Sequence, residues 1–250
     1  MKKYILLVSV LLFYCCNNQN EITVKKDQGS SDKGIEITIT KVLGSPEYKN
    51  AKLDLEVRTL ADGEYEFSFN VDQYELGLQT LKDFNYNLAN SAKGQHIHFI
   101  VNNDPYSAHY NEKFSKKIDG NSNVILAFLS RSYHESVKNK NSFVLTQIGE
   151  QNIDLNKEFL FYSRPKGTYK GADTEKLLLD FYLINTEISA DGNKVRATIQ
   201  DKKFIIDEWA PYYIEGLSKG EVKIKLELID KSGNLVDTPF NPSERIVILE

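Results

Sequence analysis

The sequence predicts an all-β protein, and three observations support this fold class. Short segments alternate apolar and polar residues, which is the period of a half-buried strand. Turn residues separate these segments at near-regular spacing, and no long window has helical periodicity. An internal similarity predicts two units of roughly a hundred residues each, a normal size for a β-sandwich. We therefore expect two tandem Ig-like, or related, antiparallel β-sandwich domains.

The N-terminal residues 1–15 have the features of a bacterial lipoprotein signal peptide. Lys2 and Lys3 precede an apolar run, residues 4–14, that is too short to span a bilayer. The run ends at Cys15 and Cys16, the only cysteines of the chain, and neighbouring cysteines rarely form a disulfide. A small residue normally precedes the lipidated cysteine, so Cys16 is the better lipidation site and Cys15 the other choice. An ordinary secretory signal is the alternative.

Residues 16–34 follow as a polar segment with glycine and serine and little to bury. Such a segment does not offset its ordering entropy, so we expect a flexible tether. A lipid such as palmitate on Cys16 would hold the chain in the cell envelope, with the outer membrane as the expected site. The expected partners are this membrane and an unknown envelope protein or anionic ligand.

The first domain is expected over residues 35–150. Its strands are predicted at 35–42, 53–57, 65–71, 97–101, 124–129 and 143–148. Long loops are expected at 78–93 and 104–117, and they have no counterpart in the second domain. Because long loops often carry function, they mark this domain as the specialised one.

The second domain is expected over residues 151–250, after a polar connection at 149–156. Its strands are predicted at 159–162, 177–184, 195–199, 204–206, 222–229 and 246–249. Four stretches of the first domain have counterparts here: 45–51 resembles 163–172, 69–76 resembles 181–188, 94–104 resembles 192–201, and 125–129 resembles 224–228.

All four histidines lie in the first domain, at His96, His98, His109 and His134. His96 and His98 would share one face of a strand, opposite the apolar face. Lys194 and Arg196 occupy the matching positions of the second domain, which predicts an exposed or rim-facing surface. The four side chains are a candidate Zn²⁺ or Cu²⁺ site, with Asp104 and Glu135 as possible carboxylate partners. Solvated or structurally hydrogen-bonded histidines are the alternative.

A second candidate site comprises Arg131, Tyr133, Arg164 and Lys166. The stretches FLSR and FYSR that end at Arg131 and Arg164 are alike, and arginine beside serine, tyrosine and lysine suits a phosphate or carboxylate. Arginines paired to acidic residues at a domain junction are the alternative.

Other function classes have little support. The net charge of −4 is spread along the chain, so we expect no nucleic-acid partner. Ser130, Ser132 and His134 lie close in sequence, but the chain has no G-x-S-x-G motif and no α/β pattern, so we expect no hydrolase and no enzyme. Phosphate-binding glycine loops are also missing from the sequence.

Several stretches resemble a family, the uncharacterised lipoproteins of Bacteroidota-type bacteria, some of which are labelled phosphopeptide-binding proteins. The stretches are GQHIHFIVNNDPY, FLSRSYHES, LFYSRPKGTY, LLLDFYLINTEIS and YYIEGLSKGEVKIKLELID. The resemblance covers nearly all of the mature chain and implies an envelope location, without an activity. A fainter similarity is to small periplasmic β-sandwich domains with an H-x-H strand followed by Asp.

We therefore expect a membrane-anchored, non-catalytic binding module, with its ligand at the first-domain loops or the groove between the domains. A metal-binding envelope protein that uses the histidines is the first alternative. A purely structural envelope protein is the second.

Overall fold

The computed structural model describes residues 36–81, 86–150 and 152–250. The expected signal peptide, tether and lipidation site at Cys16 lie outside the described residues. Among the described residues the only helix is a single 3₁₀ turn, η1 (Gly171–Thr174), and none is long or apolar enough to cross a membrane. The predicted all-β fold class is confirmed.

The described strands form four sheets. The first sheet has the order β2-β3-β6, with β2 (Lys52–Thr59), β3 (Glu64–Asp72) and β6 (Lys113–Lys117). The second has the order β5-β4-β7-β8, with β5 (Ser107–His109), β4 (His96–Val101), β7 (Ser122–Ser130) and β8 (Phe143–Gly149). Both sheets belong to the first half of the chain.

The other two sheets are built mostly from the second half. The third has the order β1-β14-β11-β9, with β1 (Thr38–Lys41), β14 (Tyr212–Glu215), β11 (Lys176–Ile184) and β9 (Phe159–Arg164). The fourth has the order β10-β16-β15-β12-β13, with β10 (Thr168–Tyr169), β16 (Ser243–Leu249), β15 (Gly220–Ile229), β12 (Lys194–Ile199) and β13 (Lys202–Ile206). Every pairing is antiparallel except the short one between β10 and β16.

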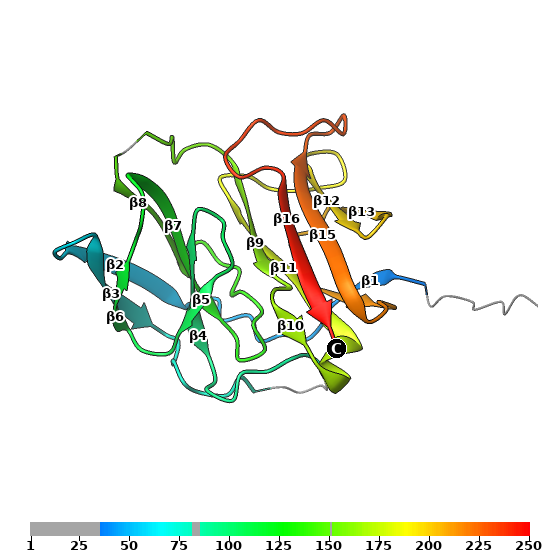
Figure 1. Cartoon of the computed structure of the whole chain (residues 1–250), viewed down its shortest axis with the longest axis horizontal. Helices are drawn as coiled ribbons and strands as arrows, with labels where there is room; N and C mark the ends of the chain where they lie inside the picture. The colour runs from blue at the N-terminus through cyan, green and yellow to red at the C-terminus, as the bar shows by residue number, and fades with distance from the viewer. Residues whose placement is uncertain (1–35, 82–85, 151) are drawn as a thin grey trace, which may run out of the picture. The chain divides into compact units, whose positions relative to one another are not determined.

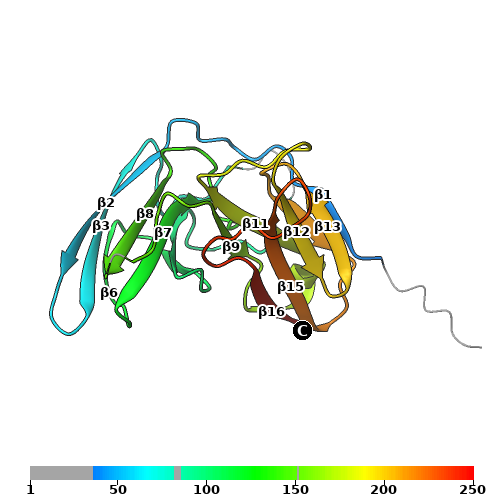
Figure 2. The same cartoon turned by 90° about the horizontal axis from the view of Figure 1, so that it is seen from above.

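The sheets pack face to face in succession, as Figures 1 and 2 show. Phe67 of β3 and Phe99 of β4 lie in the core between the first and second sheets. Leu179 of β11 and Leu226 of β15 lie in the core between the third and fourth. These two cores make two antiparallel β-sandwiches, which confirms the predicted architecture.

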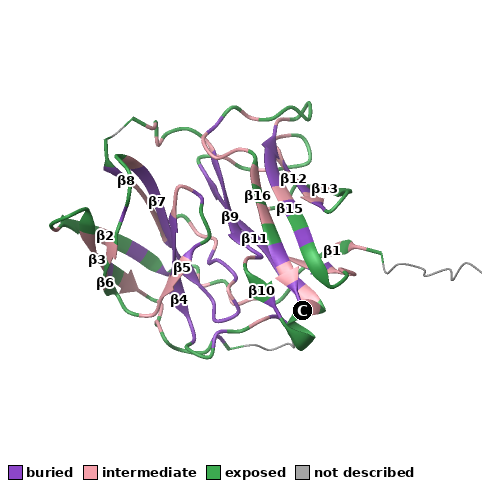
Figure 3. Cartoon of the chain, in the orientation of Figure 1, coloured by how far each residue is buried: buried purple, intermediate pink, exposed green. Residues whose placement is uncertain are grey.

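A third core joins the two sandwiches. It contains Leu126 and Phe128 of β7, Phe161 of β9 and Tyr182 of β11, and the rings of Phe128 and Tyr182 stack at 4.7 Å between centroids. The second and third sheets are therefore covered on both faces, and Figure 3 shows their strands β7, β9 and β11 coloured as buried.

The internal duplication is visible in the strand order. The order β2-β3-β6 of the first half matches β9-β11-β14, and β5-β4-β7-β8 matches β13-β12-β15-β16. The stretch with His96 and His98 is β4, and its copy is β12. Because corresponding strands have the same order in the sheets of both halves, the two halves are copies of one topology.

Two details differ from expectation. The sequence predicts residues 35–42 in the first sandwich, but β1 pairs with β14 of the second. β14 therefore lies between β1 and β11 in the third sheet. Residues 104–117 are not one long loop, because they contain β5 and β6. These strands are short, and their polar, charged residues obscure the alternation.

Candidate metal centre

The strand β4 directs His96 and His98 into the contact between the two sandwiches. Ile97 and Phe99 on its other face belong to the core of the first sandwich, whereas Ile100 shares the histidine face and lies in the core between the sandwiches. Both histidines are 0% exposed. The expectation that they face solvent is wrong, because the third sheet covers this face of β4, whereas none of the described sheets covers the matching face of β12.

The backbone before β4 determines the protonated nitrogen of His96. Gly94 has φ +83°, and a Cβ there would lie 2.4 Å from the carbonyl oxygen of Gly77, so the close approach requires glycine. The Gly94 carbonyl lies 2.8 Å from His96 Nδ1. Because a carbonyl only accepts, Nδ1 carries the proton in the neutral ring and Nε2 keeps its lone pair.

The third histidine comes from the turn that follows β7. His134 has φ +70°, a left-handed conformation that is uncommon outside glycine. Its amide donates to the carbonyl of Arg131 at 2.8 Å, and the amide of Arg131 donates to the carbonyl of Glu135 at 2.8 Å. These bonds close the turn and hold His134 opposite β4.

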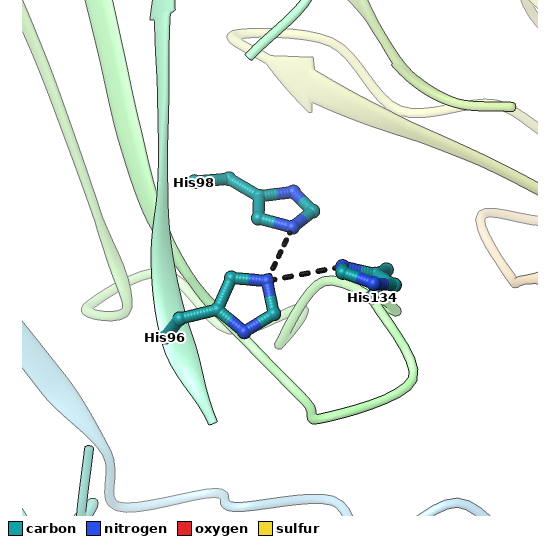
Figure 4. Close-up of side chains that lie close together, drawn as sticks. All are labelled: His96, His98 and His134. Atoms are coloured by element: carbon teal, nitrogen blue, oxygen red, sulfur yellow. Dashed lines mark hydrogen bonds between the residues drawn. The ribbon is translucent and has the colours of Figure 1, made fainter. Parts of the chain in front are cut away.

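The three imidazoles converge on a common point, as Figure 4 shows. His96 Nε2 lies 3.0 Å from His98 Nε2 and 3.1 Å from His134 Nδ1. With one ring nitrogen taken from each histidine, the three nitrogens lie within 4.8 Å of one another. Two nitrogens that bind one tetrahedral Zn²⁺ at about 2.0–2.1 Å are about 3.3 Å apart, so the spacing suits shared ligation.

Hydrogen bonding alone satisfies this arrangement poorly. The single lone pair on His96 Nε2 faces two other ring nitrogens, and it can accept only one well-aligned hydrogen bond. The hydroxyl of Tyr106 lies 3.1 Å from His134 Nδ1 and can donate to it. The lone pairs of His96 and His134 would then face each other. A cation that binds both nitrogens would take the His134 Nδ1 lone pair in place of the Tyr106 hydroxyl, which would then donate elsewhere.

Protonation does not provide that cation at neutral pH. Burial lowers the pKa of His96 to about 4. Burial also lowers the pKa of His98 and His134, and the positive charges of Arg164 and Lys166 act in the same direction on both rings. The three imidazoles are therefore neutral at pH 7, which is the form that binds metal ions.

Tyr106 and Ser163 surround the triad. The ring of Tyr106 is stacked on His98 with centroids 3.4 Å apart, and Ser163 Oγ of β9 lies 3.3 Å from His98 Nδ1. His98 therefore contacts both sandwiches. His134 is only half-buried, so solvent reaches the triad from the side of the turn.

The remaining residues of the predicted metal site lie elsewhere. His109 ends β5 and is stacked on Phe114 at 3.4 Å between centroids, with Ser107 Oγ 2.9 Å from its Nε2. It pairs across the sheet with Ile97, whose side chain lies on the face of β4 opposite the triad. Asp104 is exposed, and Glu135 accepts from Arg131 and Ser45. The structure brings together three of the four predicted histidines.

The predicted anion site is also divided. Arg131 forms a 2.9 Å ion pair with Glu135 and donates to the carbonyls of Pro46 and Ser136. Tyr133 is 0% exposed and stacks on Tyr86. Arg131 is therefore paired to an acidic residue, as in the alternative given for these arginines, and Tyr133 is buried against another tyrosine.

Arg164 and Lys166 lie next to the histidine triad instead. Lys166 Nζ lies 4.0 Å from the ring centroid of Tyr106, and the guanidinium carbon of Arg164 lies 5.3 Å from it. Arg245 of β16, which the sequence reasoning missed, donates to the carbonyls of Ser163 and Asn103. Arg245 lies in the strand sequence SERIVIL, and this pattern does not distinguish it from an ordinary exposed arginine.

No family model matches the chain, and no curated protein matches it. The solved structures that align with it include the fibronectin(III)-like modules of Clostridium thermocellum CbhA, at 11% identity over 79% of this chain and 94% of that chain, with a TM-score of 0.29. Another is the central fibronectin-III array of RIM-binding protein, at 8% identity over 82% of this chain and 71% of that chain, with a TM-score of 0.28. At TM-scores this low neither similarity bears on fold or function.

Proposed function

We propose that the chain is a non-catalytic binding module of the bacterial cell envelope and that it binds a transition metal ion, Zn²⁺ or Cu²⁺. His96, His98 and His134 are the proposed ligands. The observation that carries the proposal is the convergence of their three ring nitrogens, with His96 Nε2 3.0 Å from His98 and 3.1 Å from His134.

The chemistry of the donor set supports a borderline metal. Neutral imidazole nitrogens suit zinc and copper better than calcium or magnesium, which prefer oxygen ligands. The bond from His96 Nδ1 to the Gly94 carbonyl is the type of outer contact that orients metal-binding histidines. Half-buried His134 leaves one side of the site open to a further ligand.

The acidic residues near the triad support a binding role rather than catalysis. Glu135 is engaged by Arg131 at 2.9 Å, and Asp180 by Lys138 at 2.5 Å. Neither carboxylate is free to act as a general base on a metal-bound water.

The proposed location depends on the sequence. An N-terminal apolar run that ends at Cys16, followed by a polar segment, is typical of a lipid-anchored protein held away from a membrane. The proposed anchor is a lipid on Cys16, in the outer membrane. Growth with labelled palmitate, followed by purification of the chain and of a Cys16→Ala variant, tests this location.

Calorimetric titration of the chelator-treated full chain with Zn²⁺ and with Cu²⁺ tests the metal site. We expect one ion per chain and loss of binding in His96→Gln and in His134→Gln. His109→Gln is the matched control because it removes the one histidine outside the triad. Cobalt(II) loading gives a second readout, since tetrahedral coordination produces strong visible absorption.

Binding that persists in both triad variants, or that is lost equally in His109→Gln, would contradict the proposal. If the folded wild-type chain binds neither ion, the purely structural role becomes the better reading, and the triad is then a hydrogen-bonded junction between the sandwiches.

A further inference from the structure

Three cationic side chains gather beside the triad, and none of them contacts a carboxylate in the part of the chain that the structure describes. Arg164, Lys166 and Arg245 have no acidic oxygen within ion-pair distance among the described residues, whereas surface lysines such as Lys52 and Lys170 are paired with carboxylates. The three are close enough to repel one another. Burial has the largest effect on the pKa of Lys166, and the positive charges of Arg164 and Arg245 lower it further, to about 8. Lys166 therefore remains mostly charged at pH 7.

The hydrogen-bond partners of the three cations are neutral. Lys166 Nζ donates to the carbonyl of Tyr106 at 2.7 Å, and Arg245 donates to two backbone carbonyls. Arg164 Nη1 donates to the hydroxyl of Tyr169 at 2.9 Å. Carbonyls, hydroxyls and ring faces orient these groups but do not cancel their charge.

Arg164 is the least satisfied of the three. It is 8% exposed, and its Nε, also buried, has no acceptor among the described residues. Arginine stays charged inside proteins, and a buried charge without a counter-ion is costly. A guanidinium with a free Nε–H is also the group that binds carboxylate and phosphate oxygens most strongly.

We propose that Arg164, Lys166 and Arg245 form a binding site for a doubly charged oxyanion. A dianion suits the charge of the site: the three side chains carry a formal +3, and the exposed Asp104 carboxylate, whose negative charge acts on Arg245, offsets only part of it. The site is distinct from the metal centre and does not depend on metal binding.

The two sites are nevertheless adjacent through Tyr106. Its ring contacts His98 at 3.4 Å between centroids and Lys166 at 4.0 Å, while its hydroxyl lies 3.1 Å from His134 Nδ1. The cluster repels a metal ion in the triad, and a bound dianion would remove that repulsion. Anion and metal should therefore each strengthen the binding of the other by the same factor.

Inorganic sulfate is a suitable probe because it stays doubly charged at all relevant pH values. The chelator-treated full chain is titrated with sulfate at constant ionic strength, by calorimetry and by NMR of the arginine Nε–H signals. We expect saturable binding of one sulfate, a shift of the Arg164 signal, and acetate binding at least about tenfold weaker. Loss of one charge-assisted contact should lower the sulfate affinity about tenfold or more in Lys166→Gln and Arg164→Gln.

Matched variants separate the outcomes. Arg58→Gln removes one surface arginine that is paired with Glu66, and it should leave sulfate binding unchanged. His96→Gln should also leave it unchanged in the metal-free chain, so failure of the metal proposal does not affect this test. If Arg164→Gln unfolds the chain, half-exposed Lys166→Gln decides. No saturable binding by the wild type, or equal losses in Lys166→Gln and Arg58→Gln, would overturn the proposal.

Discussion

Arg131 and Glu135 form a 2.9 Å ion pair at the base of the turn that presents His134, and both side chains are 4% exposed. Removing one partner of a buried pair leaves an uncompensated charge, which typically costs about 3–5 kcal/mol. We expect Arg131→Gln to lower the free energy of unfolding by about that amount, measured in urea, and to weaken Zn²⁺ binding because the turn loses its anchor.

The matched control for this prediction is the surface pair of Arg58 and Glu66, also 2.9 Å apart but with Arg58 68% exposed. An exposed pair contributes less than about 1 kcal/mol, so Arg58→Gln should be nearly neutral. Equal losses in the two variants would show that the Arg131 pair has no special structural role.

The strand pattern and the duplication could be predicted from the sequence, because alternation and turn residues are local signals. The outer strand β2, with the sequence KLDLEVRT, alternates as a half-buried strand does. β7 and β11 instead contain nearly continuous apolar runs, VILAFL and LLLDFYLI, and both lie between two packed faces. A continuous run indicates a strand that is buried on both sides, so the contact between the sandwiches left a signal that alternation alone overlooks.

The environment of the candidate site was harder to predict, since the three histidines come from the first sandwich but His96 and His98 are buried by the contact with the second. Comparison with Lys194 and Arg196 of β12 predicts that the side chains of His96 and His98 face solvent. Arg196 does lie on an accessible face, where it pairs with Glu227 at 2.8 Å. The two copies share a topology but not an environment, because the third sheet covers β4 and no other sheet of residues 36–81, 86–150 and 152–250 covers β12. The role of Arg245 was equally hard to predict, because the strand pattern does not indicate its contacts with Ser163 and Asn103.

Replacing His134 by glycine separates its proposed metal role from its structural role. The left-handed φ of +70° costs a non-glycine residue about 1–2 kcal/mol, so His134→Gly relieves strain while it removes ring contacts. We expect the free energy of unfolding of the metal-free chain to change by less than about 1 kcal/mol. Zn²⁺ affinity should fall more than about a hundredfold, since even outer contacts of a metal site are worth about 10–100-fold. His134→Ala, which keeps the strain, should be less stable than His134→Gly, and unchanged Zn²⁺ affinity in both would exclude His134 as a ligand.

The pH dependence of stability should report the burial of His96. Its pKa is about 4 in the folded chain and about 6.5 when unfolded. Between these values the unfolded state binds the proton and the folded state does not. Stability is therefore highest above pH 6.5 and falls as the pH decreases toward 4.

For His96 alone the loss between pH 8 and pH 5 should be about 2 kcal/mol. This range lies above the unfolded pKa of the carboxyl groups, which limits their contribution. Urea unfolding of the chelator-treated chain at several pH values, compared with His96→Gln, measures it. Parallel curves for the two proteins would show that His96 titrates normally in the folded state.

Gly94 should tolerate no side chain, because its Cβ would overlap the backbone of the preceding loop. The built Cβ lies 2.4 Å from the Gly77 carbonyl oxygen, and φ is +83°. Gly167 has a similar φ of +73° but nothing within 4 Å, so it isolates the cost of the backbone conformation. We expect Gly167→Ala to cost about 1–2 kcal/mol and Gly94→Ala to cost about 2–5 kcal/mol, the difference being the overlap. Since the Gly94 carbonyl also accepts from His96 Nδ1 at 2.8 Å, Zn²⁺ affinity should fall in Gly94→Ala and remain unchanged in Gly167→Ala. Equal unfolding free energies for the two variants would mean that the loop moves aside freely and does not fix the His96 ring.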